Sequence, residues 1–201
     1  MHTQPLMINR PTRKPTGNVE GVDLIKRLLS RGADPNAPLR TPLLARYHNT
    51  GDGQLGAGAT PLMRAAKSLD VAVMRLLLDS GADPKLKNRT GQTALMFAAA
   101  AGRGRPEQDA IDAVTLSVDH GADVNAANDA GQTALHLAVD SSDAIVSLLA
   151  SRGAKLDIKD KQGRTALDVV LGDAPAGRGA ARGRAPEARE KTAALLRRLS
   201  E

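Results

Sequence analysis

This 201-residue sequence has no cysteine and no tryptophan, and it contains one tyrosine and one phenylalanine, Tyr47 and Phe97. Without cysteine the chain forms no disulfide and offers no thiolate for a metal site or for nucleophilic catalysis. So few aromatic side chains leave almost no surface on which the bases of single-stranded nucleic acid could stack. The hydrophobic residues, 41% of the chain, are therefore mostly small aliphatic residues, which suit closely stacked helices.

Long apolar runs are also missing. No stretch approaches the roughly 18 apolar residues of a membrane-spanning helix, so we predict no membrane span. The first 17 residues, MHTQPLMINRPTRKPTG, have no apolar segment typical of a signal peptide. The absence of cysteine suits the cytosol and the exterior equally, so the sequence assigns no compartment.

The net charge of +6 lies at the two ends of the chain. Residues 1–40 carry seven basic and three acidic side chains, residues 41–170 carry fourteen and fifteen, and residues 171–201 carry seven and four. A nucleic-acid-binding domain is expected to carry its basic face on the folded body. Because the middle of the chain is balanced, we consider nucleic acid an unlikely partner.

Self-comparison reveals an internal repeat. A Gly-Ala pair followed by Asp or Lys lies 12 residues before a Thr-x-Leu segment in three places, and the Thr-to-Thr periods are 33, 40 and 32 residues. A unit of about 33 residues, with seven inserted once, accounts for these periods. The landmarks are Gly32, Gly81, Gly121 and Gly153, and Thr60, Thr93, Thr133 and Thr165.

Each unit predicts two short helices and a turn. The threonine is a suitable N-cap for the first helix, and Pro61 fits its first helical position. The second helix is predicted to follow a capping Asp70, Asp109 or Asp143, and its apolar residues form one helical stripe. It ends at the glycine, which accepts the left-handed conformation. The polar residues that follow predict a projecting turn or short hairpin.

These segments resemble the ankyrin repeat. The first helix of that family is represented here by GATPLMRAA, GQTALMFAA and GQTALHLAV, and the turn after the second helix by GADPKLK, GADVNAA and GAKLDIK. The resemblance covers roughly residues 19–171 and implies an all-α solenoid of paired antiparallel short helices with projecting turns or hairpins. A unit this small buries its apolar face only by stacking on its neighbours.

We predict four segments: an irregular basic segment 1–17, a repeat array 18–171, a Gly/Arg-rich insertion 172–185 and a C-terminal capping helix 186–201. Within the array we predict a half repeat 18–37, an inserted loop 38–57, repeats 58–90, 91–130 and 131–162, and the start of a last repeat 163–171. Because the array begins in mid-repeat, we expect that Met1 is not the true start or that further repeats lie upstream.

Local patterns give only weak chemical signals. Residues 56–60 (GAGAT) are similar to a phosphate loop, but no lysine follows them. His48 and Asp52 are two possible metal ligands, and two ligands do not make a site. Residues 103–106 (RGRP) resemble the core of an AT-hook, but the acidic Glu107 that follows would repel phosphate. We therefore predict no catalytic residue, no metal site and no cofactor.

The resemblance implies a concave face, made of the turns and the first helices, on which the family binds protein partners. Phe97 is the best single anchor on this face, although it could equally fill core space, and Arg64 and Leu137 are expected to face the same way. The strip of turn residues is basic, then weakly acidic, then basic again. The candidate partner-binding residues are Lys87, Arg89, Thr90, Gln92, Phe97, Asp129, Gln132, Lys159, Lys161 and Arg164.

The sequence thus predicts a non-catalytic, monomeric scaffold that binds a protein partner of unknown identity, with no small-molecule substrate. Two alternatives remain open. The chain could be a regulatory or accessory segment of a larger multi-repeat protein or enzyme. It could also bind a polyanion weakly through its basic ends, which include Arg178, Arg182 and Arg184.

Overall fold

The computed structural model of the protein describes residues 18–40, 55–101, 105–172 and 185–200. The chain divides into two units, residues 1–33 and residues 34–201. The first unit contains α1 (Asn18–Ser30), whose apolar residues Leu24 and Leu28 are 59% and 50% exposed. The predicted segment 1–17 and most of the predicted insertions lie outside the described residues.

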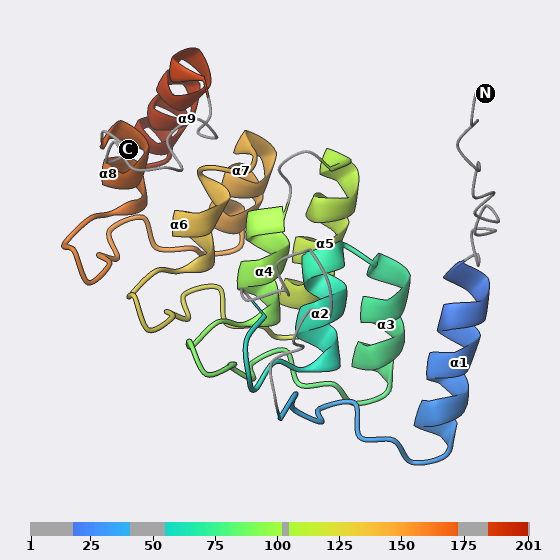
Figure 1. The fold of residues 1–201 in the computed structure, drawn as a ribbon. Helices are drawn as coiled ribbons and strands as arrows, with labels where there is room; N and C mark the ends of the chain where they lie inside the picture. Colours follow the sequence, from blue (N-terminus) through green and yellow to red (C-terminus); the bar gives the residue numbers. More distant parts are fainter. Residues whose placement is uncertain (1–17, 41–54, 102–104, 173–184, 201) are drawn as a thin grey trace, which may run out of the picture. The chain divides into compact units, whose positions relative to one another are not determined.

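The second unit is a stack of helix pairs, shown in Figure 1. The pairs are α2 with α3, α4 with α5, α6 with α7, and α8 with α9, and each first helix also contacts the next first helix, as each second helix contacts the next second helix. The described residues contain nine helices and no strand, which confirms the all-α repeat fold. The helices of this unit are α2 (Pro61–Ser68), α3 (Val71–Asp79), α4 (Ala94–Ala101), α5 (Glu107–Asp119), α6 (Ala134–Ala138), α7 (Asp143–Ser151), α8 (Ala166–Leu171) and α9 (Pro186–Leu199).

The first helices begin at the repeat threonines, as predicted. The Thr60 hydroxyl accepts a hydrogen bond from the Met63 amide at 3.3 Å, and Pro61 occupies the start of the helix. Thr93 caps α4 in the same way through the Met96 amide. These caps satisfy backbone donors that no helical carbonyl can reach.

Two predicted caps of the second helices were wrong. Asp70 caps α3 through the Val73 amide, but α7 is capped by Ser142, which precedes Asp143. The helix α5 starts two residues before Asp109, after Pro106. The helix α7 starts earlier because the Ser142 hydroxyl accepts from the Ala144 amide. The helix α5 has no side-chain cap and follows Pro106, whose fixed φ leads into the helix.

The second helices α3, α5 and α7 each end at the repeat glycine. After α3 the Gly81 amide donates to Leu78 and the Ala82 amide to Leu77, with Gly81 at a φ of +90°. This is the Schellman arrangement, and it places the buried Ala82 over the end of the helix. The same pattern recurs at the later repeat glycines. The recurring Gly-Ala pair therefore has a local cause.

The core is built from small side chains. Ala66, Ala98, Ala99 and Ala138 are completely buried along the row of first helices. The helix α4 contacts α2, α5 and α6, and so six of its eight residues are buried. Alanine faces let helices approach closely, so the scarcity of aromatic residues follows from the thinness of the layers.

The helix α9 covers the last repeat and spans Pro186–Leu199, within the segment 186–201 that we predicted as a capping helix. It contacts α7 and α8, buries Ala193 and Leu196, and its buried Thr192 hydroxyl donates to the Asp143 carboxylate at 2.5 Å. Its other face carries exposed charged side chains.

Adjacent repeats are also held by asparagine side chains. The Asn36 amide donates to the Gly81 carbonyl at 3.0 Å and its oxygen accepts from the Asp83 amide at 2.7 Å. Asn125 makes the same two bonds to Gly153 and Lys155. The repeat between these two junctions has Lys85 at the position of the asparagine. The backbone amide of Lys85 donates to the Asp83 side chain, as the equivalent amides do in the other turns.

We expect Lys85→Asn to stabilise the protein, because the new amide would bridge to the next repeat as Asn36 and Asn125 do. The two added hydrogen bonds outweigh the loss of one charge and the fixing of rotamers. We expect the free energy of unfolding to rise by about 0.5–1.5 kcal/mol. Urea unfolding would measure this gain. The reciprocal change, Asn125→Lys, should destabilise by a similar amount, and equal stability of all three proteins would contradict the bridging role.

Candidate functional site

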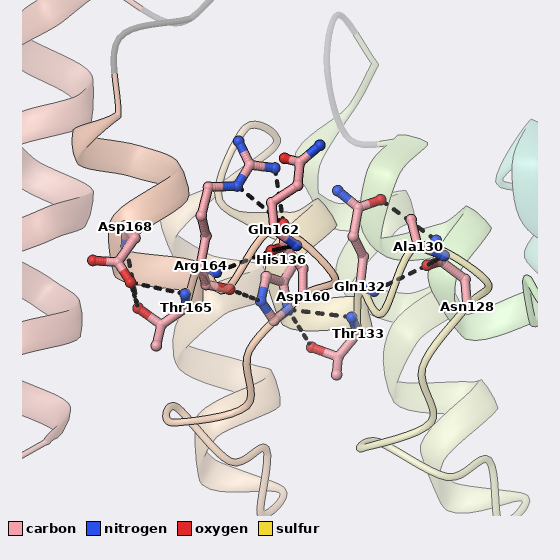
Figure 2. A network of polar contacts seen from close by, with 10 residues as sticks. All are labelled: Asn128, Ala130, Gln132, Thr133, His136, Asp160, Gln162, Arg164, Thr165 and Asp168. Atoms are coloured by element: carbon pink, nitrogen blue, oxygen red, sulfur yellow. Dashed lines mark hydrogen bonds and ion pairs between the residues drawn. The ribbon is translucent and has the colours of Figure 1, made fainter.

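One Asn or Asp side chain organises each projecting turn. The oxygen of Asn88 accepts hydrogen bonds from the Thr90 and Gln92 amides at 3.0 and 2.9 Å. Asn128 does the same for the amides two and four residues later, as does Asp160. Figure 2 shows the last two turns side by side. Each turn is therefore fixed from inside and does not need a partner to be ordered.

Backbone hydrogen bonds join each turn to the one before it. The Arg89 amide donates to Ala57 at 3.1 Å, the Asp129 amide to Thr90 at 3.0 Å and the Lys161 amide to Ala130 at 2.9 Å. These bonds form a ladder across the turns at residues 87–92, 127–132 and 159–164. We call these three turns, together with α4 and α6, the turn face.

Glycine permits this close approach. Gly91 and Gly131 have φ values of +73° and +78°, which favour glycine. A Cβ on Gly131 would lie 2.8 Å from the Lys161 nitrogen, and one on Gly91 would lie 2.8 Å from the Asp129 nitrogen. At Gly163, in the last turn, no atom lies within 4 Å of such a Cβ.

The third turn carries a buried ion pair. The carboxylate of Asp160 accepts from the Arg164 guanidinium at 2.8 and 3.1 Å through Nη2 and Nε. Burial raises the pKa of Asp160, but the hydrogen bonds from Arg164 and from the amides of Arg164 and Gln162 outweigh burial and lower this pKa to about 2. Arg164, predicted as a partner-binding residue, therefore also holds its own turn.

His136 connects the first helix of one repeat to the turn of the next. Its side chain is 3% exposed, its Nδ1 accepts from the Thr133 amide at 3.2 Å, and its Nε2 lies 3.1 Å from the Arg164 carbonyl oxygen. Because Nδ1 is the acceptor, Nε2 carries the hydrogen that reaches this carbonyl. His136 thus supports the turn that contains Arg164 (Figure 2).

A hollow of about 430 Å³ opens on the turn face between the first two turns. Its apolar part consists of Met96, Phe97 and Ala100 of α4 and Leu137 of α6. Phe97 is 5% exposed, so it fills core space and also lines the hollow. The two turns provide the rest of the lining, which consists of the polar residues Thr90, Gln92, Asn128 and Asp129 and of Ala130.

The structure brings together only part of the predicted set. Thr90, Gln92, Phe97 and Asp129 line this hollow. The other candidates do not line it. The Nζ of Lys87 donates to the Ala127 carbonyl at 2.8 Å. The rest are the exposed Arg89, Lys159 and Lys161, together with Arg164 and the half-buried Gln132.

Charge is unevenly divided between the turns and the second helices. The first turn carries two cationic side chains, the second carries Asp129, and the third carries three cationic side chains and the buried Asp160. The helix α5 has four acidic residues and no basic residue. The turn face is therefore positive at both ends, although residues 41–170 carry one more acidic than basic side chain.

Sequence reasoning missed the residues that organise the turns. Asn88, Asn128 and Asp160 each follow the repeat glycine by seven residues, so their recurrence was a visible signal. Their role was not, because an Asn or Asp in a polar turn also suits solvent exposure.

The other sequence patterns lie only partly in the described part of the chain. Arg105, from the RGRP segment, donates to the Ser68 carbonyl at the end of α2 at 2.5 Å. Within the described ranges no group of three or more His, Asp or Glu side chains is placed to hold a metal ion, and no helix has the length and apolarity needed to cross a membrane. His48, Asp52 and the arginines at 178, 182 and 184 lie outside these ranges.

Comparison with known proteins identifies the repeat. The family described as ankyrin repeats (3 copies) matches residues 17–107 and 105–171. A curated relative, the E3 ubiquitin-protein ligase KEG of Arabidopsis thaliana, is 30% identical over 158 residues, which are 75% of this chain and 8% of that protein. The chain thus spans a small fraction of this relative, and the similarity concerns the repeats.

Gly131 and Gly163, in the second and third turns, allow backbone strain to be separated from close packing. Alanine at Gly163 should cost about 1–2 kcal/mol, because a side chain strains the left-handed conformation. Gly131→Ala should cost about 1–3 kcal/mol more, because its Cβ also meets the next turn. Chemical denaturation would measure both variants, and equal losses would contradict the tight contact between turns.

Because Asp160 is paired with Arg164, we expect the free energy of unfolding to depend on pH in the acidic range. The pKa of Asp160 is about 2 in the folded state and about 3.9 in an unfolded chain. The pair therefore stabilises fully above pH ~4 and loses its effect as the pH falls toward 2. At neutral pH Asp160→Asn should cost on the order of 1 kcal/mol.

The measurement is the free energy of unfolding at several pH values. The difference between the wild type and Asp160→Asn should shrink between pH 4 and pH 2, since asparagine serves the same turn position at Asn88 and Asn128. The exposed Asp140→Asn is the control. A difference that stays constant over this range would show that the carboxylate charge does not stabilise the turn.

Proposed function

Because the chain belongs to the ankyrin repeat family, whose repeats are generally protein–protein interaction modules, we propose that it binds a protein partner on the turn face. We propose that this face is the concave face that the family resemblance implied. The binding residues that we propose are the ten predicted from the sequence, and the repeat boundaries predicted there are part of the same proposal.

The observation that carries this proposal is the internal fixation of the turns. Asn88, Asn128 and Asp160 satisfy the amides of their own turns, and the ladder holds the turns in one register. A surface ordered before binding loses little conformational entropy when a partner docks. The hollow beside Phe97 offers a site where an anchoring side chain of the partner can be buried.

The family is generally non-catalytic, and we propose that this chain likewise has no catalytic activity and uses no cofactor. A second candidate is an accessory segment of a larger protein. It is favoured by the relative of Arabidopsis thaliana, in which the matching region is 8% of a much longer protein named as a ligase. In either case the repeats would act by binding.

The proposal is tested by charge reversal on the turn face. We expect the triple variant Lys87→Glu, Arg89→Glu, Lys161→Glu to lose partner recovery from an extract of the source cells at least ~10-fold, because reversed charges repel a complementary surface. Quantitative mass spectrometry of the captured proteins would measure this loss. Thermal unfolding of the variant would confirm that it remains folded.

The matched control is the triple variant Arg75→Glu, Lys191→Glu, Arg198→Glu. It changes the net charge by the same amount on exposed residues of α3 and α9, and it should recover the partner like the wild type. If both triple variants recover the partner equally well, binding does not use the turn face.

A further inference from the structure

The hollow on the turn face has an apolar floor and a polar rim. Met96 and Phe97 are buried beneath it, Leu137 is half-buried and Ala100 is exposed within it. Its volume of about 430 Å³ falls within the range of roughly 300–1,000 Å³ that accommodates small ligands. A large aliphatic side chain can therefore enter it and remove the accessible apolar atoms of Leu137 and Ala100 from water.

Cationic side chains lie on both sides of this hollow along the stack. Lys87 and Arg89 belong to the first turn, and Lys159 and Lys161 belong to the third, and all four are exposed. The bond from Lys87 to the Ala127 carbonyl holds its ammonium group beside the second turn. The stack thus presents positive charge, an apolar site and positive charge in order along its turns.

We infer that the partner segment bound on the turn face is an extended acidic peptide with a central aliphatic residue, which enters the hollow while carboxylates before and after it reach the cations of the first and third turns. This inference rests on the proposed function and adds the chemistry of the partner. Opposite charges steer such a segment to the face and fix its register, and the buried side chain anchors it.

The repeat spacing sets the length of the segment. Stacked helices lie about 8–10 Å apart, so the first and third turns are separated by roughly 16–20 Å. An extended chain advances about 3.3 Å per residue, so about five or six residues span this distance. We therefore expect two groups of carboxylates about five or six residues apart, with the aliphatic anchor between them.

A nucleic acid fits this face less well than a peptide. The exposed Asp129 lies between the two groups of cations, where a continuous phosphate backbone would meet its carboxylate. Phe97 is 5% exposed and so offers little ring surface for a base to stack on. A peptide avoids both difficulties because it places an uncharged side chain at this point.

The test uses the full chain and a fluorescein-labelled peptide, Asp-Glu-Ser-Leu-Ser-Glu-Asp, in an anisotropy titration. Replacing its leucine by glycine should weaken binding ~10-fold or more, because the buried aliphatic side chain is lost. A peptide with Lys and Arg in place of the acidic residues should not bind, and higher salt should weaken the acidic peptide.

Variants of the protein locate the binding. Ala100→Leu fills the hollow without removing any core atom and should weaken the acidic peptide ~5–10-fold. Ala72→Leu makes the same change on the exposed side of α3 and should leave binding unchanged. The triple variant at Lys87, Arg89 and Lys161 should bind at least ~10-fold more weakly than the control triple variant.

Several results would overturn the inference. They are no binding of the acidic peptide at millimolar concentration, equal binding of the basic peptide, indifference to Ala100→Leu, or tighter binding of a single-stranded oligonucleotide through the same cations. If the peptide fails while the turn-face variant still loses the cellular partner, the partner chemistry is wrong and the proposed function stands. If the variant keeps its partner, the proposed function itself fails.

Discussion

The stacking of each repeat on its neighbours is the interaction on which the rest of the second unit depends. A pair of helices of eight or nine residues, such as α2 and α3, is too thin to enclose its own apolar side chains. Met74, Leu95 and Leu135 are nevertheless almost completely buried, because the adjacent repeat supplies the other wall. Alanine-rich first helices, glycine in the turns and the bridging asparagines all serve to bring repeats close.

Close stacking also produces the candidate binding surface. Turns that must lie within hydrogen-bond distance of one another are held in register, so the side chains they project have fixed relative positions. Residues such as Arg164 then have two roles, because the guanidinium that pairs with Asp160 also contributes charge to the exposed strip. The positive character of this strip is local, since the acidic side chains of the repeats are concentrated on elements such as α5.

Much of the fold could be predicted from sequence because its signals are local. The threonine caps, the glycines after the second helices and the bounds of α9 each depend on a few neighbouring residues. The caps of α5 and α7 were misplaced because the predicted aspartates compete with Pro106 and Ser142 for the start of the helix. Of the predicted site residues, Thr90, Gln92, Phe97 and Asp129 line one hollow, because stacking places equivalent positions of successive repeats side by side.

The repeat, the class of fold and the absence of thiol chemistry follow from the composition and from the order of residues within one unit. Only the tertiary structure decided whether Phe97 is core or surface, and its ring is both buried and part of the hollow. The tertiary structure also assigned Asn88, Asn128 and Asp160 to the turns and His136 to the junction between repeats. Their partners lie in a folded turn or in the next repeat, and such contacts exist only after the repeats have stacked.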